Sequence, residues 1–212
     1  MSRRIYTKDD LFDSIDNELS WRKKELKLFK DSIPTEFSSK QTVLLRCAIP
    51  IIYAHWEGFV KHSCELYLEF VSNRNEVLRS LKPQFIAIAL RNYIQAQEIN
   101  KVSERTKAVE FIINNLDLPT TIPIKNVIKT KSNLKFDIFK DICHLLCIPI
   151  YEFEKKKSMI DELVDARNTI AHGNHLKINY KMFCEFYDDT IILLDTLRTE
   201  IENAAVLDFH RS

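Results

Sequence analysis

Three polar side chains near residue 170 have types that could act together on a phosphodiester bond. They are Arg167, Asn168 and His172, all within the segment from Asp165 to Gly173. Histidine titrates near neutral pH and can transfer protons as a general base or acid. A guanidinium can hold two phosphate oxygens and stabilise the charge that develops in a transition state. The amide of Asn168 could orient the phosphate or fix the tautomer of the histidine.

The spacing of these residues favours a site made from two copies of the segment. On a helix, Asn168 and His172 share a face, whereas Arg167 lies about 140° around the axis from His172. Arginine and histidine therefore do not form a tight site on one helix. We expect two copies to face each other across the two-fold axis of a homodimer, with the ribose 2′-hydroxyl of an RNA substrate as nucleophile. Spacing alone leaves another reading open, in which His172 only favours the dipole at a helix end.

Glu57 is a further candidate, because it follows Trp56 in the most apolar helix that the sequence predicts. As a site residue it would contact the substrate, or pair with Arg167 or a catalytic histidine. The alternative is that Trp56 belongs to the core and Glu57 is a surface carboxylate or a buried structural partner. The sequence does not decide between these two interpretations.

A run of three lysines, Lys155, Lys156 and Lys157, precedes the segment that carries the motif. With the loop from Lys125 to Lys135, this run could guide the backbone of an RNA. The net charge of +1 gives no general field that attracts nucleic acid, so RNA contacts would need such a local basic patch. The alternative interpretation is that these lysines are solvated surface.

No metal or cofactor is expected. Cys143, His144 and Cys147 have the types of metal ligands, but a second pair of ligands is missing and their neighbours are apolar. We therefore expect these cysteines to lie in the core. The sequence has no glycine-rich phosphate loop, so ATP or GTP chemistry has no support.

Composition favours long helices in one cytoplasmic domain. Two glycines and six prolines are too few for the frequent turns of a sheet protein, and a chain that is 45% apolar can bury a full core. Five cysteines without framework spacing indicate a reducing compartment. The N-terminus has no apolar signal core, and the apolar stretch from Cys47 to Trp56 is too short to span a membrane.

Apolar spacing predicts an all-α bundle of six to seven helices. The expected domain covers residues 1–212, with a core of about 40–204 and an N-terminal helix, within 1–35, packed on it. The expected helices cover residues 7–33, 40–72, 83–93, 103–116, 134–146, 158–172 and 179–204.

Three local features refine this prediction. Thr7 with Asp10, and Ser158 with Asp161, have the spacing of N-terminal helix caps. The helix that begins at Pro83 has a predicted buried set: Phe85, Ile86, Ile88, Ala89 and Tyr93. Residues 117–133, rich in proline, threonine and lysine, are the best candidate for a mobile basic loop.

Three segments resemble a known family. The stretch from Leu163 to Gly173 resembles the signature of the HEPN superfamily, an arginine followed after four to six residues by a histidine. The stretch from Tyr53 to Lys61 resembles the early helix of the MAE-type branch, which is close to the RiboL-PSP HEPN group. The stretch from Ser132 to Leu134 is also similar to that branch. The resemblance spans roughly residues 40 to 200.

The resemblance implies a helical bundle that dimerises through the motif helix and cuts RNA without a metal. Such proteins often act as toxins or defence effectors and are neutralised by an antitoxin protein. Arg167 and His172 would be the catalytic pair, with Asn168 beside them. One subclass carries a modifiable tyrosine two residues after the histidine; here Asn174 takes that place, so this mode of neutralisation is not supported. Because some members lack ribonuclease activity, a non-catalytic module that binds RNA or protein is the alternative, and a purely structural scaffold is a third reading.

Overall fold

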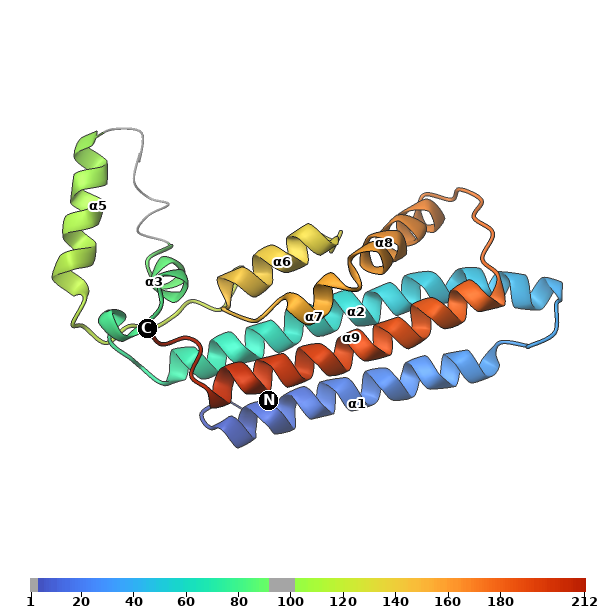
Figure 1. The fold of residues 1–212 in the computed structure, drawn as a ribbon, viewed down its shortest axis with the longest axis horizontal. Helices are drawn as coiled ribbons and strands as arrows, with labels where there is room; N and C mark the ends of the chain where they lie inside the picture. Colours follow the sequence, from blue (N-terminus) through green and yellow to red (C-terminus); the bar gives the residue numbers. More distant parts are fainter. Residues whose placement is uncertain (1–3, 92–101) are drawn as a thin grey trace.

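Three long helices form the base of the molecule: α1 (Lys8–Ser32), α2 (Ser39–Asn73) and α9 (Tyr180–Val206). The computed structural model describes residues 4–91 and 102–212, and within it each of these helices contacts the other two. They lie along the long axis of the molecule, where α2 and α9 run in one direction and α1 in the other (Figure 1). The N-terminal helix is therefore part of the three-helix base.

Shorter helices cover one side and one end of this base. Helix α8 contacts α2, α6 and α9, helix α7 contacts α9, and α3 contacts α6. Helix α5 lies beyond α3, at the end of the molecule away from α8 (Figure 1). The described residues contain eight α-helices, one 3₁₀ turn and no strand, so the predicted all-α class is confirmed. The shorter elements are η1 (Leu78–Ser80), α3 (Pro83–Ala89), α5 (Val102–Asn115), α6 (Phe136–Leu145), α7 (Tyr151–Glu154) and α8 (Lys157–Ala171).

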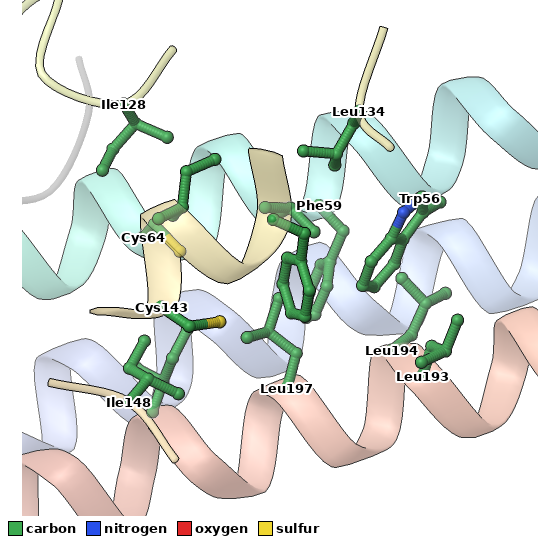
Figure 2. Close-up of a cluster of buried hydrophobic side chains, with 14 of the residues drawn as sticks. Trp56, Phe59, Cys64, Ile128, Leu134, Cys143, Ile148, Leu193, Leu194 and Leu197 are labelled. Atoms are coloured by element: carbon green, nitrogen blue, oxygen red, sulfur yellow. The ribbon is translucent and has the colours of Figure 1, made fainter. Parts of the chain in front are cut away.

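Helix α2 is apolar on most of its circumference because other helices surround it. Its Trp56 and Phe59 lie in one cluster with Leu194 and Leu197 of α9, and Leu134 joins them from a loop (Figure 2). Each such side chain contributes about 1.5–3 kcal/mol when fully buried. The length and apolar composition of α2 would also suit a membrane span, but half of its most apolar window is buried inside the bundle. These are the properties of a core helix.

One of the two predicted helix caps is present. Thr7 and Asp10 form a reciprocal capping box at the start of α1, as predicted. The predicted cap at Ser158 is wrong, because α8 already begins at Lys157 and has no side-chain cap. The carboxylate of Asp161 instead accepts a hydrogen bond from the backbone N–H of Phe136, 2.8 Å away, at the start of α6.

Helix α3 begins at Pro83, as predicted, and buries Phe85 and Ile88. Ile86 and Ala89, from the same predicted set, are partly buried and pack against the core. Tyr93, the remaining member of that set, lies outside the described residues.

The segment 117–133 contains no helix or strand, but it is packed against the bundle over part of its length. Ile122, Val127 and Ile128 are buried. The hydroxyl of Ser72, in α2, donates to the carbonyl of Ile122 and accepts from its N–H, at 2.9 and 3.1 Å. The expectation of a mobile loop is corrected in this respect: apolar side chains anchor the segment, and its lysines face solvent.

Candidate active site

The motif lies in the last turns of α8 and in the turn that ends this helix. The N–H of Gly173 bonds to the carbonyl of Ile170, and the N–H of Asn174 bonds to the carbonyl of Thr169, both at 3.0 Å. This is a Schellman motif, which needs a left-handed residue, and Gly173 supplies it with φ of +79°. His172 precedes this glycine; its side chain is exposed and makes no hydrogen bond within the described residues.

Arg167 is held by two neutral groups. Its Cζ lies 4.0 Å from the ring centroid of Tyr53, and its Nη2 donates to the carbonyl of Ser132 at 2.6 Å. Its Nε is buried and has no partner. Within residues 4–91 and 102–212 no carboxylate lies within 4.0 Å of its guanidinium. The guanidinium is thus fixed in place, but its positive charge is not neutralised.

Asn168 is tied to the loop that precedes α6. Its Nδ2 donates to Oδ1 of Asn133 at 2.9 Å. The same loop contacts α8 again through an ion pair of Lys135 with Asp165, 2.7 Å long. Arg167 and Asn168, adjacent in sequence, therefore contact adjacent residues of this loop, Ser132 and Asn133. We call residues 132–134 the site loop.

Arg46 also lies at this end of α8 and was not found from the sequence. Its Nη2 donates to the carbonyl of Asn174 at 2.7 Å, and it forms no ion pair within the described part of the chain. Arg46 is separated from the motif by more than 100 residues, so local spacing gives no signal for it. The only signal is that Arg46, Tyr53 and Glu57 recur at intervals of seven and four, on one face of α2.

Glu57 lies one helical turn after Tyr53 and is half-buried, but it does not pair with Arg167 in this structure. Burial raises the pKa of the Tyr53 phenol, and the negative charge of Glu57 adds to this effect. Glu57 therefore lies near Tyr53 but makes no ion pair with the guanidinium of Arg167. Trp56, its neighbour, is fully buried, as the alternative interpretation predicted.

The structure does not bring the lysine run together with the motif. Lys155 pairs with Glu152 at 2.7 Å, Lys156 with Asp189 at 2.6 Å and Lys157 with Asp137 at 3.0 Å. The run also lies at the beginning of α8, roughly 22 Å from the motif end at 1.5 Å per residue. The proposed role of these lysines in guiding substrate loses its support, because each of the three is paired with a carboxylate.

Cys143 and Cys147 lie in or against the core, as predicted. Cys64 and Cys143 are buried, and burial raises the pKa of both thiols. Cys147 packs partly buried against the core, whereas His144 is exposed. Within the described ranges, no group of three or more His, Cys, Asp or Glu side chains could hold a metal ion.

Comparison with known proteins gives one family. The chain matches the family model described as RiboL-PSP-HEPN over residues 17–203. This range includes Arg46, Tyr53, the site loop and the motif. No curated protein and no solved structure matches the chain.

Proposed function

Because the chain belongs to the RiboL-PSP-HEPN family, we propose that it is a metal-independent endoribonuclease that acts through Arg167, Asn168 and His172. The observation that carries this proposal is that the charge of Arg167 is not neutralised. Its guanidinium is held by the ring of Tyr53 and the carbonyl of Ser132, and His172, five residues later, is exposed. Ser132 occupies one of the five guanidinium donors, so others remain for a phosphate.

The proposed reaction needs no outside nucleophile. The ribose 2′-oxygen attacks the neighbouring phosphorus while the bond from phosphorus to the 5′-oxygen of the next nucleotide breaks. The products are a 2′,3′-cyclic phosphate and a 5′-hydroxyl. His172 takes the proton from the 2′-hydroxyl or returns one to the leaving 5′-oxygen, and Arg167 stabilises the charge on the phosphate oxygens. Asn168 is fixed by Asn133 and orients the phosphate.

We assign the local basic patch that the weak net charge requires to positive side chains that contact the motif segment or lie close to it or to the site loop in sequence. Arg46 contacts the turn after His172, Lys131 precedes the site loop, and Lys177 follows in the connection to α9. None of the three forms an ion pair with a carboxylate in the part of the chain that the structure describes. We assign to these residues the contacts with flanking phosphates that the sequence assigned to the lysine run.

We propose further that two chains form a homodimer in which Arg167 of one copy acts with His172 of the other. The large angle between the two side chains on one helix supports this arrangement. A ribonuclease of this kind fits a toxin or defence effector that a partner protein neutralises. The alternative function, a non-catalytic module that binds RNA or protein, uses the same surface.

The test incubates the wild type, His172→Ala and the matched control His175→Ala with total RNA and labelled tRNA in EDTA. His175 is exposed in the same connection, three residues after His172. Wild type and control should yield products that end in 2′,3′-cyclic phosphate, whereas His172→Ala should lose about 10²–10⁴-fold in rate. RNA binding without cleavage by the wild type would favour the binding module, and cleavage that EDTA abolishes would contradict the metal-free mechanism.

A mixing experiment tests the shared site. Arg167→Ala and His172→Ala are each inactive alone, but one composite site in the mixed dimer contains both intact residues. Co-expressed and purified as a mixed dimer, the pair should recover up to about half of the wild-type activity, on the geometry of a two-fold site. A mixed dimer without activity would place both residues of one site in the same chain.

A further inference from the structure

Tyr53 contacts both parts of the proposed site. Its ring lies under the guanidinium of Arg167, with 4.0 Å between Cζ and the ring centroid. Its hydroxyl accepts a hydrogen bond from the backbone N–H of Leu134 at 2.8 Å. Tyr53 is only 3% exposed, so its position is set by α2 and the core.

The hydroxyl of Tyr53 fixes the loop whose residues hold the motif. The side chain of Leu134 is fully buried and points into the core cluster (Figure 2). The two residues before it hold the motif. The carbonyl of Ser132 accepts a hydrogen bond from Arg167, and the side-chain oxygen of Asn133 accepts one from Asn168. A displacement of this loop would therefore move both polar partners of the motif together.

We infer that Tyr53 is a positioning residue of this site, which orients Arg167 with its ring and the site loop with its hydroxyl. The inference rests on the proposed ribonuclease function. A carboxylate would hold the guanidinium more strongly, but it would also cancel the charge that a phosphate needs. An aromatic face and a carbonyl restrain the guanidinium and leave its charge available.

The protonation state of Tyr53 is consistent with this role. Burial raises the pKa of its phenol, although the N–H of Leu134 and the guanidinium of Arg167 act in the opposite direction. The phenol therefore stays neutral near neutral pH. An ionised phenolate would instead act as the missing counterion of Arg167.

Tyr67 provides a matched control on the same helix. It is fully buried, and its hydroxyl donates to the carbonyl of Ala204 at 3.4 Å, in the core against α9. Tyr53→Phe and Tyr67→Phe thus remove the same atom from the same helix. Only the first change affects a group that contacts the site loop.

The kinetic test compares these two variants with the wild type on a labelled RNA. Tyr53→Phe should lower kcat by about tenfold with KM changed by less than about twofold, because a small displacement of catalytic groups costs rate more than binding. Tyr53→Leu, which also removes the ring, should lower kcat further. Thermal melts of the two phenylalanine variants should agree. If Tyr53→Phe and Tyr67→Phe have the same kcat, the inference is wrong.

A second measurement does not depend on activity. Amide hydrogen exchange of Leu134 should be about tenfold faster in Tyr53→Phe and unchanged in Tyr67→Phe, because only the first loses the acceptor. The NMR signal of the buried Nε–H of Arg167 should weaken in Tyr53→Leu. If the wild type cleaves no RNA, the proposed function fails, and these signals alone decide whether Tyr53 holds Arg167. Unchanged exchange and an unchanged arginine signal would overturn the inference.

Discussion

Arg22 and Arg167 contact roughly opposite faces of α2 and pack in the same way. The Cζ of Arg22 lies 4.4 Å from the ring centroid of Trp21, and that of Arg167 lies 4.0 Å from the ring centroid of Tyr53. In both residues Nε is buried and has no partner. Stacking on an aromatic ring is therefore common to both regions and does not by itself distinguish a structural arginine from a functional one.

The two regions differ in the charge that faces the guanidinium. Arg22 pairs with Glu18 at 3.0 Å and donates to the carbonyl of His55, and its guanidinium lies against Gly58. Arg167 has no such carboxylate within the described residues and lies nearer to solvent. Arg22, which has a counterion, thus joins α1 to α2, whereas Arg167, which is restrained by neutral groups, keeps its charge available for an anion.

The largest expected effect is on activity at Arg167. Arg167→Ala should lower the rate of RNA cleavage by about 10²–10³-fold, because it removes the stabilisation of the transition-state charge. The free energy of unfolding should fall by only about 1 kcal/mol, which corresponds to the loss of the stacking contact. Cleavage kinetics and urea denaturation measure the two quantities. If Arg167→Ala unfolds readily but cleaves RNA at the normal rate, Arg167 has a structural role and not a catalytic one.

The opposite pattern is expected for Arg22. Arg22→Ala should lower the free energy of unfolding by about 1–3 kcal/mol, because it removes a buried guanidinium together with its hydrogen bonds to Glu18 and to the carbonyl of His55. Cleavage by the folded fraction should not change. Lys27→Ala is the control, because Lys27 forms an exposed pair with Asp31 on the same helix, and such pairs contribute less than about 1 kcal/mol. Equal destabilisation by the two changes would show that the Arg22 contact is not structural.

The smallest expected effect is that of Gly58→Ala on the free energy of unfolding, and its sign should depend on whether Arg22 is present. A Cβ at Gly58 would lie 2.9 Å from Nη1 of Arg22, so the guanidinium would have to move. Because this movement would disturb its contacts with Glu18 and the Trp21 ring, Gly58→Ala should destabilise the wild type by about 1 kcal/mol. In the Arg22→Ala background the space is free, and the better helix propensity of alanine should stabilise by about 0.5–1 kcal/mol. A double-mutant cycle by urea denaturation measures this reversal. The same sign in both backgrounds would mean that Arg22 does not explain the glycine.

Local signals in the sequence predicted the helices well. The capping box at Thr7 and the proline at Pro83 act within one helical turn, so their residues suffice to place the starts of α1 and α3. The composition of the motif segment likewise predicted that Arg167 and Asn168 lie in the last turns of α8. The cap at Ser158 failed because Asp161 bonds to the start of another helix, a contact that local spacing cannot reveal.

Charge in the site could not be predicted, because ion pairs form between distant segments. Lys156 and Lys157 appeared to be free cations until the fold placed Asp189 and Asp137 beside them. Arg46 appeared to be an ordinary helix residue until the fold placed it at the turn after the motif. The number of charged residues in a sequence therefore indicates the composition of a surface. It does not show which of these charges remain unpaired after folding.

The helix order has a consequence for the synthesis of the protein. The base of the bundle joins α1 and α2 to α9, which follows α2 by more than 100 residues. While the ribosome makes the chain, α1 and α2 must wait for residues 180–206 before their shared core can close, and such distant contacts form late in folding. Helix α8 packs on α2 and α9, so its motif lacks firm support until then. A growing chain would thus acquire the proposed activity toward RNA only after residues 180–206 have been made.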